Sequence, residues 1–206
     1  MKTITQVTVQ QKNKKRSNLF LDGVYYCSLD NLLVVKYSLK AGVKITKQKL
    51  AEIQEENEFS YAFDLALGYI SRYRKTKKQL IEYLLKKGYL PTLANKVVDK
   101  LSSYGYLDDK DYARVYAEQN SKTKGKILIK MQLKAKGIDE QTANIAVENL
   151  GDETPQVIEL AKKYLKNKEK DFKTLSKCYR YLLSKGFSYD AVSSAIDSLK
   201  DEYNEN

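Results

Sequence analysis

The sequence predicts a mainly α protein, in which tandem three-helix repeats form an elongated, curved array behind a small N-terminal β-hairpin and helix module. Gly88, Gly137 and Gly186 lie 49 residues apart, each directly after a lysine and each thirteen residues before a leucine. Self-similarity at a fixed period is typical of repeat proteins, whose units complete their cores against their neighbours. The functional surface is therefore expected to run along the repeats instead of lying in one deep pocket.

The first 57 residues differ from the rest and predict a small α+β module. The run 4–9 is rich in β-prone residues, and 18–27 reads as a hairpin around Asp22-Gly23. Asp30 is placed to cap a short helix that extends through Leu39, and Thr46 to cap another that extends through Ile53. We expect the acidic stretch 55–58 to connect this module to the first repeat.

Three repeats are predicted at 58–107, 108–153 and 154–206. Apolar residues spaced by three, four and seven positions define one face of each helix, so that each repeat reads as three amphipathic helices. In the first helices we expect the core positions to be Phe63, Ala66 and Leu67, then Tyr112, Val115 and Tyr116, then Ala161, Tyr164 and Leu165. The repeated glycine is predicted to end the second helix in a left-handed conformation.

Helix starts are also marked in the sequence. Twelve residues before each repeated glycine stand Thr76, Gly125 and Thr174, which are acceptable N-caps for the second helices. Asp139 and Ser188 are placed to cap the third helices of the later repeats. The lysine before each glycine suits the negative end of the helix dipole.

Composition excludes several classes of function. The chain has no histidine, which removes the commonest general base and metal ligand, and its carboxylates lie at expected caps and polar faces. Cys27 and Cys178 lack metal or redox spacing and are expected to be reduced. We therefore predict no enzyme, no catalytic residue, no metal and no cofactor. No apolar run is long enough to span a membrane, and we expect a cytoplasmic monomer.

The formal net charge of +11 is unevenly spread along the 206 residues. Residues 1–57 hold 10 Lys/Arg against 5 Asp/Glu, and residues 58–107 hold 9 against 4, whereas residues 151–206 hold 10 of each. Only 5 of the 37 cationic residues are arginine, the residue that best reads base edges. This balance favours binding to single- and double-stranded DNA through the backbone, largely independent of sequence.

Three basic clusters are the candidate DNA-binding sites. They comprise Lys12, Lys14, Lys15 and Arg16; Arg72, Arg74, Lys75, Lys77 and Lys78; and Lys122, Lys124 and Lys126. The second and third clusters fall at the same turn of successive repeats. A lysine in the first turn of a helix opposes the dipole, and a phosphate bound to the free backbone N–H groups there would reverse that cost.

Longer stretches resemble a known family. The stretches Arg72-x-Arg74-x-Thr76 through Gly88, Tyr104-Gly-Tyr-Leu-Asp-Asp109 through Ala113, and Gly125 through Ile138 are similar to the RecX family of bacterial regulators of the RecA recombinase. The resemblance covers the whole chain. It implies tandem three-helix repeats, no catalysis, and a protein that lies in the groove of the RecA–DNA filament. It further implies modulation of recombination, ATPase and co-protease activity, with inhibition the favoured direction.

Two other functions remain open from the residues themselves. Three-helix units of this size can place a helix in the major groove, as a sequence-dependent helix-turn-helix-like regulator does. A helical-repeat protein adaptor would use its lysines only as solvated surface.

Overall fold

The computed structural model describes residues 1–169 and 171–204, the last four by their backbone alone. The predicted fold class is confirmed, because three three-helix domains follow an N-terminal β-sheet module. The curvature of the array stays a prediction. The chain divides into two compact units, Met1–Tyr73 with Tyr83–Lys100, and Arg74–Glu82 with Leu101–Asn206, each of which is described by itself below.

A four-stranded antiparallel sheet with the order β3-β2-β1-β4 opens the first unit. Its strands are β1 (Lys2–Val9), β2 (Arg16–Leu21), β3 (Val24–Asp30) and the short β4 (Lys44–Ile45). Asp22 and Gly23 join β2 to β3 with φ of 50° and 84°, the left-handed pair that a tight two-residue hairpin requires, so the predicted hairpin is confirmed. The core of this module comprises Ile4, Leu19, Leu21, Leu29, Leu39, Ile45, Leu50 and Ile53.

Two helices follow the third strand, and both begin at the predicted caps. Asp30 caps α1 (Asn31–Lys36) by accepting a hydrogen bond from the backbone N–H of its second residue at 2.7 Å. Thr46 caps α2 (Lys47–Ile70) by accepting from the third at 3.1 Å. The first helix ends before the expected Leu39.

The second of these helices corrects an expectation, because α2 is one helix of 24 residues. The acidic stretch 55–58 lies within it and is not a connection. No glycine or proline interrupts 47–67, so nothing in the local sequence ends the helix there. The expected boundary between 57 and 58 falls inside α2, and the division into four domains stays a prediction.

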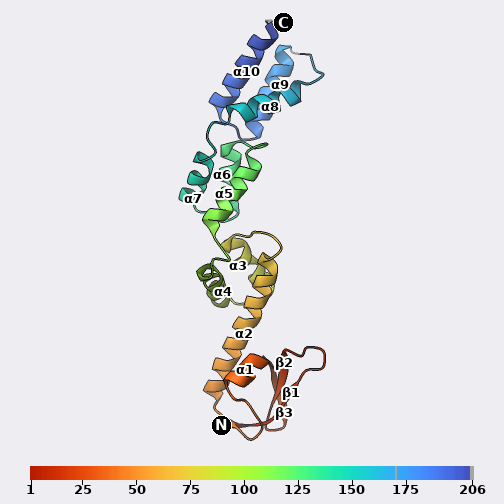
Figure 1. Ribbon diagram of the computed structural model, residues 1–206, viewed down its shortest axis with the longest axis vertical. Helices are drawn as coiled ribbons and strands as arrows, with labels where there is room; N and C mark the ends of the chain where they lie inside the picture. The colour runs from red at the N-terminus through yellow and green to blue at the C-terminus, as the bar shows by residue number, and fades with distance from the viewer. Residues whose placement is uncertain (170, 205–206) are drawn as a thin grey trace. The chain divides into compact units, whose positions relative to one another are not determined.

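The second unit contains two complete three-helix groups, which Figure 1 shows as α5–α7 and α8–α10. These helices are α5 (Asp109–Asn120), α6 (Lys126–Ala135), α7 (Glu140–Glu148), α8 (Thr154–Leu165), α9 (Phe172–Ser184) and α10 (Tyr189–Asn204). Each group has its own core, built around Ile129 and Leu133 in one and around Leu182 and Phe187 in the other.

The first repeat comprises the C-terminal part of α2 together with α3 (Lys77–Lys86) and α4 (Pro91–Ser103). Its helices bury Ala62, Ala66, Leu84, Ala94 and Val97. Gly88, Gly137 and Gly186 have φ of 90°, 90° and 81°, which confirms the predicted left-handed helix ends.

The first helices of the repeats bury only some of the residues expected in the core. Ala66, Ala161 and Leu165 are confirmed as buried, whereas the other expected positions are half-buried. Ala113 and Ala117 are fully buried in α5, whereas Tyr112 and Tyr116 are half-buried at its edge. Corresponding buried alanines are Ala62 in α2 and Ala161 in α8.

The predicted caps are mostly confirmed. Asp139 accepts from the Thr142 N–H at 2.8 Å, and the Ser188 hydroxyl accepts from the Ala191 N–H at 3.3 Å. Thr174 is not a cap, because α9 begins three residues earlier than its counterparts and is capped by Asp171.

Candidate nucleic-acid interface at the joints between repeats

The start of α3 contacts the end of α6, and we call this contact the first joint. Thr76 is fully buried, and its hydroxyl donates a hydrogen bond of 2.7 Å to the carbonyl of Lys136, the residue before Gly137. The side chain of Lys78 lies against Gly137, where a Cβ would come within 2.4 Å of it. The first joint therefore depends on the side chains of α3.

The start of α6 contacts the end of α9 in the equivalent way, and we call this contact the second joint. The Gly125 N–H donates to the carbonyl of Lys185 at 2.9 Å, and the Ile127 N–H donates to the carbonyl of Gly186 at 3.1 Å. A Cβ on Gly125 would lie 2.1 Å from the Gly186 carbonyl oxygen. Backbone meets backbone at the second joint.

Carboxylates of the protein occupy the helix starts at both joints. A carboxylate oxygen of Asp109 accepts from the Lys77 N–H at 3.0 Å. Glu153 accepts from the Lys126 N–H at 3.0 Å with one oxygen and from the Ser188 N–H at 2.7 Å with the other. These contacts correct the expectation that a phosphate meets free N–H groups there, because the protein supplies the anion that the dipole favours.

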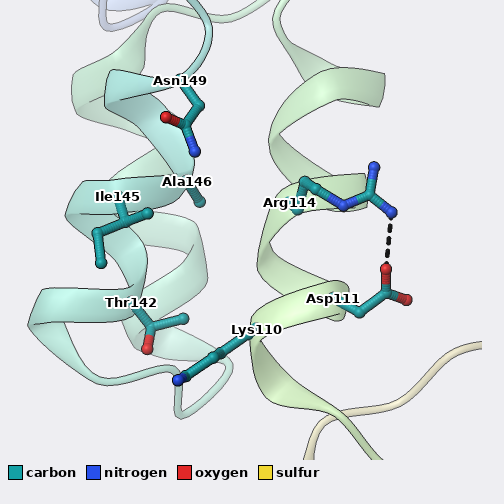
Figure 2. A pocket seen from close by; sticks show the side chains of 7 residues that line it. All are labelled: Lys110, Asp111, Arg114, Thr142, Ile145, Ala146 and Asn149. Atoms are coloured by element: carbon teal, nitrogen blue, oxygen red, sulfur yellow. Dashed lines mark hydrogen bonds and ion pairs between the residues drawn. The ribbon is translucent and has the colours of Figure 1, made fainter.

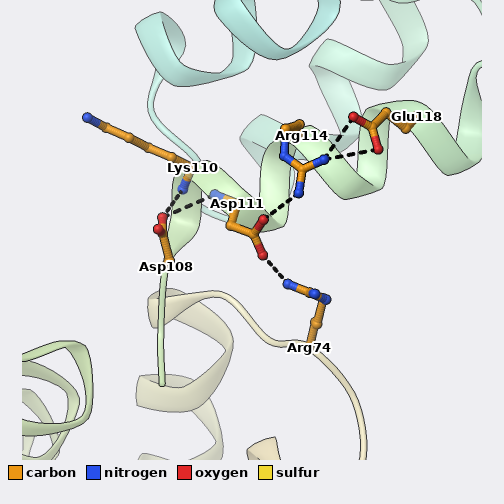
Figure 3. A network of polar contacts seen from close by, with 6 residues as sticks. All are labelled: Arg74, Asp108, Lys110, Asp111, Arg114 and Glu118. Atoms are coloured by element: carbon orange, nitrogen blue, oxygen red, sulfur yellow. Dashed lines mark hydrogen bonds and ion pairs between the residues drawn. The ribbon is translucent and has the colours of Figure 1, made fainter. Parts of the chain in front are cut away.

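An ion-pair network surrounds the first joint, as Figure 3 shows. Asp111 pairs with both Arg74 and Arg114, and Arg114 also contacts Glu118 at 3.0 Å. The Arg114 hydrogen bond is the main reason that the pKa of Asp111 lies below its ordinary value, and the charge of Arg74 lowers it further. Asp108 caps α5 by accepting from two backbone N–H groups. Arg74 is therefore partly neutralised by the protein itself.

The N-terminal basic cluster lies in the first unit, between β1 and β2. Lys12, Lys14 and Lys15 are exposed and form no ion pair within the described residues. Arg16 differs, because its guanidinium donates to the Ser28 carbonyl at 3.1 Å and lies 3.9 Å from the centre of the Tyr61 ring. This arginine links the sheet to α2, so its side chain is committed to the fold.

The two repeat clusters are divided between exposed and committed side chains. Lys77 and Lys122 are exposed and Lys126 is half-buried, and none of the three forms an ion pair in the described part of the chain. Lys78 reaches the Ala135 carbonyl at 3.3 Å, and Lys124 donates to two side-chain amide oxygens at 2.7 and 2.9 Å. The other members are Arg72, which is exposed and belongs to the first unit, and Lys75, which is half-buried in the second.

Three further lysines lie outside the three candidate clusters. Lys87, Lys136 and Lys185, which precede the repeated glycines, each lie above a tyrosine ring of their own repeat at 5.2–5.7 Å from its centre. The sequence shows a lysine before each repeated glycine, but the negative end of the helix dipole is enough to explain a lysine there. The tyrosine beside each lysine comes from a position that only the packing of the helices reveals.

A pocket of about 370 Å³ lies between α5 and α7, as Figure 2 shows. It is lined by Lys110, Asp111, Arg114, Thr142, Ile145, Ala146 and Asn149. Aliphatic groups form much of its wall, and its acidic member is held by Arg114. Within the described residues, no group of three or more cysteine, aspartate or glutamate side chains could hold a metal ion.

Three-helix groups whose helix starts and helix ends meet in a recurring contact define a helical-repeat protein. Four models of the RecX family match the chain: the RecX N-terminal domain at 2–46, and the first, second and third three-helix domains at 62–101, 108–147 and 156–196. The chain belongs to the RecX family of regulatory proteins.

Curated relatives support this assignment along the full length. A regulatory protein RecX of Bacillus subtilis (strain 168) is 34% identical, over 100% of this chain and 80% of that protein. Another, of Clostridium beijerinckii, is 34% identical over 95% of both chains.

Solved structures agree with the fold. A crystal structure of a regulatory protein RecX superposes with a TM-score of 0.77 at 23% identity, covering 96% of this chain and all of that one. RecX from Lactobacillus salivarius gives a TM-score of 0.65 at 28% identity, covering 70% of this chain and 98% of that one.

Membership of the family makes this chain a non-catalytic regulatory protein and a regulator of RecA. No helix in the described part of the chain is long and apolar enough to cross a membrane.

Proposed function

We propose that this chain inhibits RecA by binding in the groove of the RecA–DNA filament, where it contacts both protein and DNA and restrains recombination, ATP hydrolysis and co-protease activity. The observation that carries the DNA-binding part is a set of lysines beside the two joints that form no ion pair with any described residue, Lys77, Lys122 and Lys126. We call them the joint lysines.

Their position supports binding to phosphate. Lysine acts as a mobile point charge, and the helix starts beside these residues already hold carboxylates, so the side chains themselves meet the DNA backbone. Lys77 and Lys126 stand at the same position of successive repeats, eleven residues before the repeated glycine, so each of the two joints offers a contact to the strand. Repeat three lacks this feature, since its second helix starts at Phe172, is capped by Asp171 and begins amid mixed charges.

Lys12, Lys14 and Lys15 are further contacts for DNA, single- or double-stranded, whereas Arg16 serves the fold. Since the helix groups of the second unit enclose their own cores, we expect the protein to act as a monomer. We expect binding to be largely independent of base sequence.

The first test follows ATP hydrolysis and strand exchange by RecA filaments on single-stranded DNA as this protein is added. We expect inhibition well below one molecule per RecA protomer, and tighter binding to RecA-coated DNA than to naked DNA. Equal affinity for both would contradict groove binding. An effect on neither activity, with naked DNA still bound, would favour a general DNA-binding protein.

A variant with Lys77→Gln, Lys122→Gln and Lys126→Gln tests the joint lysines. Loss of three phosphate contacts should lower the slope of log affinity against log salt by about 2 to 3 units. The matched control carries Lys49→Gln, Lys163→Gln and Lys200→Gln, which remove the same charge from lysines already paired with carboxylates. Equal slopes for the two variants would mean that the joint lysines do not meet phosphate.

A further inference from the structure

A tyrosine and a lysine recur beside one another in all three repeats. In the first repeat, Tyr83 stacks on Tyr69 with ring centres 4.0 Å apart and planes 3° from parallel. The ammonium of Lys87 lies 5.7 Å from the centre of the Tyr83 ring. This pair joins the first helix of the repeat to the second and leaves both rings half-exposed.

The third repeat has the same arrangement. Tyr181 stacks on Tyr164 at 4.9 Å with 26° between the planes, and Lys185 lies 5.2 Å from the Tyr181 ring. A second cation, Lys168, lies 3.5 Å from the Tyr164 ring. Tyr83 and Tyr181 both stand five residues before the glycine of their repeat.

The second repeat keeps the ring but changes its position. Gln132 occupies the place of Tyr83 and Tyr181, and the hydroxyl of Tyr116 donates to its amide oxygen at 2.6 Å. Tyr116 supplies the aromatic ring from the first helix, with Lys136 5.4 Å from its centre. A ring on one helix therefore replaces a ring on the other, and the neighbouring lysine is retained.

Packing of the core does not explain this recurrence. Alanine and leucine fill the interior between these helices, and the rings lie at its edge. A lysine in the last turn suits the helix dipole, but that effect needs no ring beneath it. The lysine ammonium lies beyond 5 Å from the ring centre in each patch, a weak contact that a ligand can replace.

We propose that these three tyrosine–lysine patches, built on Tyr83 with Lys87, Tyr116 with Lys136 and Tyr181 with Lys185, are stacking sites for the unpaired bases of single-stranded DNA. A base stacks on the exposed part of each tyrosine, and the lysine moves to the adjoining phosphate. Stacking tolerates any base, in keeping with the scarcity of arginine. This inference rests on the proposed function, because it requires that the chain bind DNA.

The test compares an oligodeoxythymidylate with an abasic strand of the same length, by fluorescence anisotropy of a label on the DNA at fixed salt. Both strands carry the same phosphates, so backbone binding treats them alike. We expect the strand with bases to bind at least about fivefold more tightly, since stacking of even one base on an aromatic residue has an effect of that size. Equal affinities overturn the inference.

A variant with Tyr83→Leu, Tyr116→Leu and Tyr181→Leu should lose this preference for bases and bind the abasic strand as before. The same positions changed to phenylalanine keep the ring and should retain the preference. As a matched control, Tyr25→Leu, Tyr106→Leu and Tyr189→Leu alter exposed tyrosines outside the patches and should leave it intact. Should the leucine variant fail to fold, the abasic comparison with the unchanged protein still decides the question.

The outcomes separate this inference from the proposed function. Equal, salt-dependent binding of both strands together with inhibition of RecA would remove the stacking sites and leave the filament proposal in place. No binding of either strand would overturn the stacking sites and the DNA-binding part of the proposed function together.

Discussion

The two joints of the second unit bring the same parts of successive repeats together by different means. At the first joint a side-chain hydroxyl, that of Thr76, reaches the carbonyl before the repeated glycine. At the second joint the backbone N–H of Gly125 makes the equivalent hydrogen bond. Both joints therefore place a hydrogen bond on the carbonyl of the residue before the repeated glycine. The donor is a side-chain hydroxyl where the second helix begins after Thr76 and a backbone N–H where it begins after Gly125.

The difference has a physical consequence for the glycines. At the second joint a Cβ on Gly125 would meet the main chain of Gly186, and a Cβ on Gly186 would meet Leu128, including its backbone nitrogen. At the first joint a Cβ on Gly137 would meet only side-chain atoms of Lys78. A backbone joint has fewer freely rotating bonds than a side-chain joint, so we expect the second joint to be the stiffer of the two.

The largest effect is expected for Gly125→Ala. Its Cβ would meet the Gly186 carbonyl carbon and oxygen at 2.1–2.2 Å, and main chain yields less readily than the end of a side chain. We expect a loss of about 3 kcal/mol in the free energy of unfolding, measured by urea denaturation.

Gly186→Ala and Gly151→Ala form a matched pair for the same question. Both positions have positive φ, 81° and 70°, so both variants incur the backbone strain of an alanine there. Only Gly186 faces a neighbour, Leu128 at 2.3 Å, while a Cβ on Gly151 meets nothing within 4 Å in the described chain. We therefore expect Gly186→Ala to lower the free energy of unfolding, measured by urea denaturation, more than Gly151→Ala does. An equal decrease for the two variants would mean that the second joint is looser than the contacts indicate.

An intermediate effect is expected from the carboxylates at the joints. Glu153 accepts two backbone hydrogen bonds at the second joint, and Asp109 accepts one at the first. Removal of a charged cap leaves donors unpaired, so Glu153→Ala should lose about 2 kcal/mol and Asp109→Ala about 1 kcal/mol. Urea denaturation of both variants measures the difference, and a larger loss for Asp109→Ala would reverse our ranking of the joints.

The smallest effect concerns the ion pairs of the first joint. The pKa of Asp111 is lowered by Arg114 first and then by Arg74, so its pairing stabilises the fold at neutral pH. This contribution is lost as the pH falls through the lowered pKa of Asp111. Following the Asp111 carboxyl by NMR, we expect Arg114→Gln to raise its pKa more than Arg74→Gln does. If the pKa of Asp111 changed in neither variant, the ion-pair network would not form in solution.

Part of the candidate site could be predicted from sequence. The clusters at Arg74–Lys78 and Lys122–Lys126 fall at equivalent turns because the repeat period places them there. The sequence does not show that Asp109 and Glu153 cover the helix starts, since those contacts join residues 32 and 27 positions apart. It also does not show which lysines are neutralised, because that depends on neighbours from another helix.

The sequence by itself determined the features that arise within a few residues: the left-handed glycines, most caps, the Asp22-Gly23 hairpin and the three helices of each repeat. These follow from local backbone conformation and the period of apolar residues. Only the tertiary structure decided that Ala113 and Ala117 fill the core of α5 where Tyr112 and Tyr116 were expected, and how the joints are made. Close packing between segments that are distant in sequence depends on the size of each side chain and on the neighbours that it meets. A local sequence pattern does not show which residues become neighbours.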